Sequence, residues 1–149
     1  MDLILWRHAE AEDGVPDKTR DLTAKGEKQA SGMAAWLKSR LPRETKVLTS
    51  PATRAIRTAR YLVDEPEVVR ALDVGATPAA VLAAAGWPEN GSVVVVGHQP
   101  TLGRVAALLL SGEEADWVIK KGAIWWFTNR VRGGEAQTVL RAVMAPDLL

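Results

Sequence analysis

Short, wholly apolar runs that end abruptly in polar residues constrain the fold of this chain most strongly. Leu3–Trp6 is followed directly by Arg7 and His8, and four consecutive valines, 93–96, are followed by a glycine and His98. Apolar runs without alternation are typical of strands that are buried on both faces, as in a parallel sheet. The sequence therefore predicts a central sheet that is covered by other elements on both sides.

Segments with helical spacing lie between these strands. Apolar residues recur at every third or fourth position from Thr23 to about Arg40. A second apolar strand, 46–49, leads into Ser50 and Pro51, which we expect to cap a helix and to occupy its first position. Residues 67–69 suggest a short strand, and the spacing predicts further helices at 77–86 and 100–110.

This alternation predicts an α/β fold, a three-layer α/β/α sandwich with a mostly parallel central sheet. Near the end of the chain the pattern changes. Residues 123–130 and 136–143 are strand-like, and Gly133 and Gly134 between them predict an antiparallel hairpin at the sheet edge. The 149 residues suffice for one domain, 1–149, and they contain no repeat or linker.

Composition excludes several classes of function. The net charge is +1 and the basic residues are dispersed, so neither nucleic acid nor an anionic membrane is an expected partner. The absence of cysteine removes disulfides, thiolate metal sites and cysteine nucleophiles. No apolar stretch is long enough to span a bilayer, and the first residues lack the pattern of a signal peptide. We therefore expect a cytoplasmic protein.

Polar side chains gather where the predicted strands end. Arg7 and His8 follow one strand, His98 follows another, and Ser50-Pro51 after a third strand lead to Arg54. Because ligands bind beyond the carboxyl ends of parallel strands, we expect these four side chains to meet at one edge of the sheet. Arginine and helix N-termini are suited to phosphate. No glycine-rich nucleotide motif is present, so the pattern favours a phosphate site of another kind.

Three motifs, in this order, resemble those of the histidine phosphatase superfamily. Arg7-His8-Ala9 resembles its Arg-His-Gly signature, residues 50–59 resemble Ser-Pro-x-x-Arg-Ala-x-Gln-Thr-Ala, and residues 97–100 match Gly-His-x-Pro. The short chain is similar to the SixA-type phosphohistidine phosphatases in particular. That similarity includes the pattern Asp17-x-x-Arg20-x-Leu22-Thr23-x-x-Gly26.

The resemblance implies a phosphohydrolase that needs neither a metal nor a cofactor. Neutral His8 would attack phosphorus and form a phosphohistidine intermediate, which water then hydrolyses. Arg7, Arg54 and a protonated His98 would surround the phosphoryl oxygens, and Arg20 would be a further phosphate-binding residue. Phosphate or sulfate is expected to occupy the same site. The arginines would repel a metal cation, so no metal site is expected.

The proton donor for the leaving group stays open at this stage. Members of the superfamily commonly carry a carboxylate after the second motif, where this chain has Ala71. Asp17 is the candidate for acid–base help, and the alternative is a local cap or a salt bridge to Arg20. An alkoxide leaving group needs a proton donor more than an imidazole does. The sequence therefore favours a phosphohistidine-bearing protein as substrate. The alternatives are a small-molecule phosphomonoester phosphatase and a non-catalytic phosphate-recognition module.

Two residues depart from the motifs of the superfamily. Ala9 replaces a glycine, which adds a methyl group near the expected phosphate, and Arg57 replaces a glutamine. Arg57 is expected on a solvated helix face, with the rim of the site as the alternative. Trp6 precedes the site, and core packing is its expected role.

Overall fold

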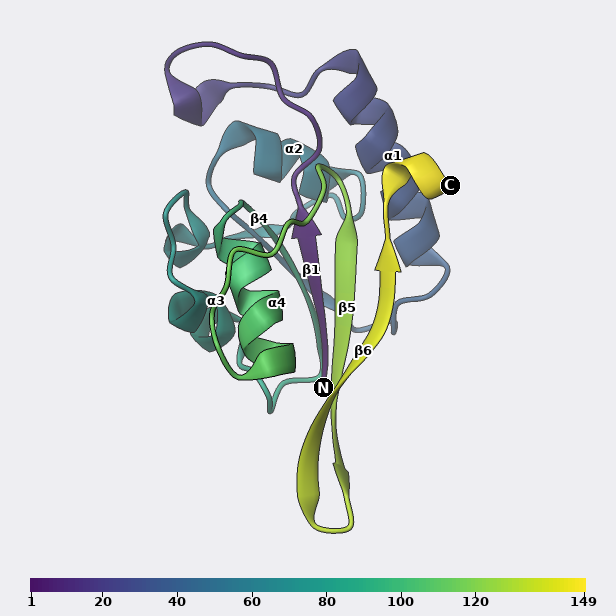
Figure 1. The fold of residues 1–149 in the computed structure, drawn as a ribbon. Coiled ribbons are helices and arrows are strands. Elements are labelled where there is room, and N and C mark those ends of the chain that lie inside the picture. The colour runs from purple at the N-terminus through teal and green to yellow at the C-terminus, as the bar shows by residue number, and fades with distance from the viewer.

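A six-stranded sheet forms the centre of the protein in the computed structural model, which describes residues 1–149 (Figure 1). The strands lie in the order β3-β2-β4-β1-β5-β6, and the first four are parallel. β5 pairs antiparallel with β1, and β6 pairs antiparallel with β5. The strands are β1 (Asp2–Arg7), β2 (Lys46–Thr49), β3 (Glu67–Val68), β4 (Ser92–Gly97), β5 (Ile124–Arg132) and β6 (Glu135–Met144).

Helices cover both faces of the sheet, which confirms the predicted three-layer sandwich (Figure 1). The helices are α1 (Ala24–Lys38), α2 (Thr53–Arg60), α3 (Pro78–Ala85) and α4 (Thr101–Ser111), with short 3₁₀ turns η1 (Asp17–Thr19), η2 (Arg70–Leu72) and η3 (Pro146–Leu148). One core cluster joins the sheet to α3 and α4, and a second joins it to α1 and α2.

The continuous apolar run of β1 follows from this double coverage. Successive side chains of a strand point to opposite faces, so Leu3 and Leu5 pack toward α3 and α4, whereas Ile4 and Trp6 pack toward α1 and α2. All four are fully buried. Trp6 belongs to the core as expected, and its indole N–H donates to the carbonyl of Gly122 (3.0 Å).

Threonine hydroxyls cap two of the helices, whereas the one cap predicted from the sequence is absent. The Thr23 hydroxyl caps α1, and the Thr77 hydroxyl caps α3. The predicted cap at Ser50 and helical Pro51 are wrong, because α2 begins at Thr53. Ser50 is fully buried, and its hydroxyl contacts both the Ala52 N–H and a ring nitrogen of a histidine. It therefore closes a turn before the helix instead of capping the first helical turn.

The predicted C-terminal hairpin is confirmed as β5 and β6. Gly133 and Gly134 form its turn with positive φ angles of 57° and 80°, which non-glycine residues rarely adopt. Its tip projects beyond the sheet at the end where β1 begins (Figure 1). The opposite end, where β1, β2 and β4 finish, is left free to form a site. No helix in the structure is long and apolar enough to cross a membrane.

Candidate active site

The parallel pairing of β1 with β4 brings the two histidines together. Arg7 and Gly97 are register partners at the ends of these strands, and the His8 N–H donates to the Gly97 carbonyl (3.1 Å). The next residue of each strand is therefore a histidine at the same sheet edge. The ring centroids of His8 and His98 lie 5.2 Å apart, and both side chains are buried.

Two contacts determine which nitrogen of His8 carries the proton. Nδ1 lies 2.7 Å from the Ala9 carbonyl oxygen, and Nε2 lies 3.3 Å from Nε of Arg54. A carbonyl oxygen can only accept a hydrogen bond and a guanidinium can only donate one. His8 therefore carries its proton on Nδ1 and presents an unprotonated Nε2. The carbonyl of Ala9 therefore holds the ring in one tautomer.

Burial keeps His8 neutral. The pKa of the ring is lowered from 6.5 to about 3, mainly by its removal from water and to a smaller extent by the neighbouring His98 and the positive charges of Arg54 and Arg7. The hydrogen bond to Ala9 acts in the opposite direction. Desolvation therefore has a larger effect than the charges of the two arginines. At neutral pH Nε2 is unprotonated, and its lone pair accepts the Arg54 N–H.

Arg54 lies directly beside this lone pair. It comes from the first turn of α2 and is only 3% exposed. Its two terminal nitrogens donate to the Asp17 backbone carbonyl (2.9 Å) and carboxylate (3.2 Å). Asp17 also accepts from Arg20 Nε (3.0 Å), and this bond is the main cause that lowers the pKa of the Asp17 carboxyl group. The salt bridge to Arg20 foreseen as an alternative is therefore present.

Arg7 borders the same site from β1. One terminal nitrogen donates to the Ile119 carbonyl (2.8 Å), which holds the side chain against the loop before β5. Its Nε is buried and has no hydrogen-bond partner. A buried donor without a partner is costly, and an anion in the site is the kind of group that could accept from it.

His98 is also neutral in the free protein. Burial, and next the charge of Arg54, lower its pKa from 6.5 to about 4. One ring nitrogen, Nε2, lies 2.7 Å from the Ser50 hydroxyl. The sequence-based interpretation described His98 as protonated. The difference arises because the desolvation of the buried ring and the positive charges of Arg54 and Arg7 outweigh the negative charges of Asp73 and Asp17.

These side chains surround a cavity of about 300 Å³. The structure brings Arg7, His8, Arg54 and His98 together around it, and Arg20 also lines it. Asp17 contacts the cavity only through the two arginines that it binds. No group of three or more His, Cys, Asp or Glu side chains is arranged to hold a metal ion. The arrangement can bind a phosphoryl group and present a nucleophile to it.

Comparison with known proteins agrees with this chemistry. The family model of the histidine phosphatase superfamily (branch 1) matches residues 3–77. Phosphohistidine phosphatase SixA of Escherichia coli is 33% identical over 124 residues, which are 76% of each chain. The chain belongs to the histidine phosphatase superfamily. It is a phosphatase, and therefore a hydrolase.

Solved structures share the fold of this phosphatase. The protein histidine phosphatase SixA complexed with tungstate matches it with a TM-score of 0.78 and 30% identity, covering 99% of both chains. A phosphoserine phosphatase from Entamoeba histolytica matches with a TM-score of 0.70 and 19% identity, covering 99% of this chain and 98% of the other. At that identity the second similarity concerns the fold alone.

The structure explains both departures of this phosphatase from the superfamily motifs. Ala9 is fully buried and packs in a small cluster with Leu22 and Ala30, so its methyl group does not line the cavity. The Arg57 side chain is 33% exposed on α2 and does not line the cavity. Its guanidinium binds Asp21 (2.7 Å) and also Glu27 in α1, so it ties the loop before α1 to α2.

Three polar residues that line the cavity are not among the site residues expected from the sequence of this phosphatase. They are Asp13, Gln99 and Lys121. Gln99 stands inside the third motif, which offered a signal for it. Asp13 and Lys121 lie in irregular segments with no sequence pattern that indicates where their side chains point.

Proposed function

We propose that this phosphatase removes phosphate from a phosphohistidine-bearing protein, with His8 as the nucleophile. The observation that carries the proposal is the state of the His8 ring. Its Nδ1 proton is held by a backbone carbonyl, so Nε2 is unprotonated and lies at the cavity. A neutral imidazole with a fixed tautomer is the form that can attack phosphorus.

Arg7, Arg54 and His98 are placed to bind the phosphoryl oxygens. Arg7 has a free Nε donor, and Arg54 directs its Nε at the nucleophile. When a phosphoryl group enters, an oxygen of that group would take the Arg54 N–H and free the His8 lone pair for attack. The negative charge would also raise the pKa of His98 and allow it to donate a proton to an oxygen. The tungstate bound in the related SixA structure supports an oxyanion site here.

The proposed reaction has two displacements at phosphorus. His8 Nε2 forms a bond to phosphorus while the bond from phosphorus to the substrate imidazole nitrogen breaks, and the departing imidazole takes a proton from water. Water then attacks the phosphorylated His8, which releases inorganic phosphate and restores the free ring. Each step is stabilised by fixed cationic donors around the equatorial oxygens.

The leaving group decides between a phosphoramidate and an ester. Asp17 was the candidate acid, but the hydrogen bond from Arg20 and the charge of Arg54 favour its ionised form, which has no proton to donate. Asp13 is the one carboxylate that lines the cavity. We propose that Asp17 and Arg20 orient Arg54 and that the departing imidazole needs no carboxylic acid. The similarity to SixA supports a phosphohistidine substrate.

A rapid-quench experiment tests the nucleophile. Wild-type protein and the His8→Gln variant are mixed with a ³²P-labelled phosphohistidine peptide. We expect an acid-labile, base-stable phosphoprotein in the wild type and none in the variant. His98→Gln is the matched control, since it removes the other histidine but leaves Nε2 of His8 in place. Phosphoprotein that forms equally well in His8→Gln would exclude His8 as the acceptor.

Comparison of substrates tests the leaving group. The phosphohistidine peptide should be hydrolysed faster than a phosphoserine peptide of the same sequence. Asp13→Asn should leave phosphohistidine turnover unchanged, because the imidazole leaves without a carboxylic acid. Faster turnover of phosphoserine, together with its loss in Asp13→Asn, would instead identify an ester phosphatase that uses Asp13 as its acid.

A further inference from the structure

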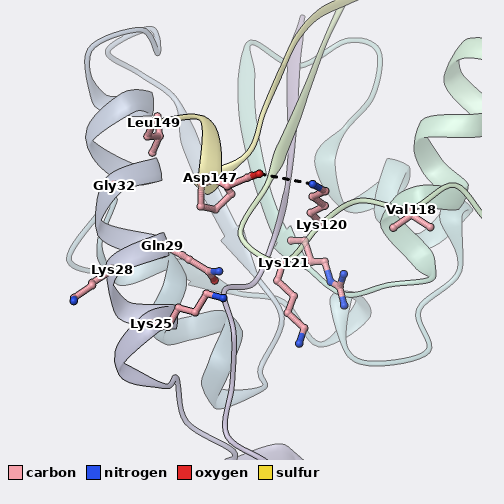
Figure 2. Close-up of a pocket in the computed structure, with 11 residues that line it drawn as sticks. Lys25, Lys28, Gln29, Gly32, Val118, Lys120, Lys121, Asp147 and Leu149 are labelled. Atoms are coloured by element: carbon pink, nitrogen blue, oxygen red, sulfur yellow. Dashed lines mark ion pairs between the residues drawn. The ribbon is translucent and has the colours of Figure 1, made fainter.

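A second hollow adjoins the catalytic cavity, and four of the 11 residues that line it are lysines (Figure 2). Its volume is about 620 Å³, roughly twice that of the cavity around His8. Both are lined by Arg7 and Lys121, so the two hollows are neighbours that share these residues. We call this hollow the lysine groove. Its cationic lining consists of Arg7, Lys25, Lys28, Lys120 and Lys121.

The charges of the lysine groove are almost uncompensated. Its single acidic residue is Asp147, which lies 3.8 Å from Lys120, a loose contact between two exposed side chains (Figure 2). Lys25, Lys28 and Lys121 form no salt bridge and are exposed. The whole chain has a net charge of only +1. The groove is therefore a local concentration of positive charge beside the active site, not a consequence of overall composition.

The position of Lys25 indicates that this charge is not there for stability. It is the second residue of α1, close to the positive end of the helix dipole. A cation at a helix N-terminus is unfavourable and an acidic residue is favoured there. The side chain makes no contact that offsets this cost. In Figure 2, Lys25 from α1 and Lys121 from the loop before β5 extend from opposite walls of the groove.

We propose that the lysine groove binds an acidic segment of the protein whose phosphohistidine enters the catalytic cavity. This inference rests on the proposed function, because it names where that substrate would be held. The groove is too large for a single phosphate, and its ammonium groups come from two separate walls. An extended chain with several carboxylates could contact both walls while a neighbouring phosphohistidine reaches His8. Such complementary charge would steer association and position the substrate.

A pair of charge reversals tests the proposal. Lys25→Glu/Lys28→Glu changes the groove without altering any residue of the cavity. Arg43→Glu/Lys46→Glu is the matched control, because it makes the same change in net charge on exposed residues near the start of β2, at the opposite end of the sheet. For a phosphohistidine peptide with acidic flanking residues, the groove variant should raise KM about tenfold. The control should change KM little.

Two further substrates show whether the effect depends on the acidic segment. The groove variant should lose little activity on the same peptide with neutral flanks, and little on phosphoramidate itself. Equal losses of activity on all three substrates would mean that the lysines act only through the electrostatic potential in the catalytic cavity. That result would overturn the proposal of a docking groove.

Binding without turnover separates this inference from the proposed function. A fluorescent acidic peptide that lacks phosphate should bind the wild type in a salt-dependent manner, bind the control variant equally and bind the groove variant about tenfold more weakly. Failure to bind the wild type would overturn the groove even if phosphohistidine is hydrolysed. Tighter binding of inorganic tripolyphosphate than of the peptide would show that the groove selects small polyanions instead. Absence of phosphohistidine turnover with intact, groove-dependent peptide binding would overturn only the proposed function.

Discussion

Lowering the pH should destabilise this protein through its two buried histidines. In the unfolded chain each ring has a pKa near 6.5, whereas in the folded protein the values are about 3 for His8 and about 4 for His98. Between about pH 4 and 6.5 the unfolded state therefore binds more protons than the folded state. The free energy of unfolding should therefore rise with pH across this window. The stability that the two neutral rings contribute should be lost as the pH falls through it.

The size of the effect follows from the two pKa values. At about pH 5 a histidine in the unfolded chain is almost fully protonated, while both rings in the folded protein are almost fully neutral. Each ring should therefore lower the free energy of unfolding by about 2 kcal/mol relative to pH 7.5. The total of about 4 kcal/mol is large beside the roughly 5–15 kcal/mol that stabilises a typical domain. The effect should therefore be measurable by urea unfolding.

Urea unfolding at the two pH values, followed by the fluorescence of the six tryptophans, provides the assay. The double variant His8→Gln/His98→Gln removes both titrating rings and leaves all other acidic and basic groups in place. Between pH 7.5 and pH 5 the wild type should lose about 4 kcal/mol more than the double variant. Equal losses would refute the reasoning. In NMR spectra, neither histidine should titrate between pH 5 and 8, and His8 should show a protonated Nδ1.

Two further predictions concern the loop that carries the site. Gly26→Ala would place a methyl group 2.0 Å from the Glu10 carbonyl oxygen and should cost about 1–3 kcal/mol in urea unfolding. The control Gly91→Ala, which meets nothing within 4 Å, should change stability by about 0.5 kcal/mol or less. Thr58→Val should cost about 1–3 kcal/mol, because the Thr58 hydroxyl accepts from the buried Ala9 N–H. Thr58→Ser should restore most of the loss; if it does not, that hydrogen bond is not the cause.

Local sequence patterns were sufficient for most of the fold. The apolar run of β1, the four valines of β4 and the hairpin glycines each favour one structure through short-range geometry and burial. The start of α2 was not predictable in this way. Serine is a common N-cap residue, but the Ser50 hydroxyl contacts a ring nitrogen of His98, a residue 48 positions away. A contact at that separation leaves no signal in local spacing.

The same distinction applies to the site. The sequence alone indicated Arg7, His8, Arg54 and His98. Each stands at the end of a strand or a few residues after it, and the parallel pairing brings these strand ends to one edge. It could not indicate which atoms meet. The tautomer of His8 depends on Arg54, which reaches it from another helix.

Charge states and surfaces were decided by tertiary structure alone. Burial is the main cause that lowers the pKa of both histidines. Residues adjacent in sequence do not indicate this effect, because desolvation depends on how the folded chain packs around the ring. The lysine groove joins α1 to the loop before β5, nearly a hundred residues later in the chain. The sequence by itself determined which strands are buried and which residues stand at their ends, since periodicity and composition are local. Protonation states and the joining of distant lysines into one surface arise only when the chain is folded.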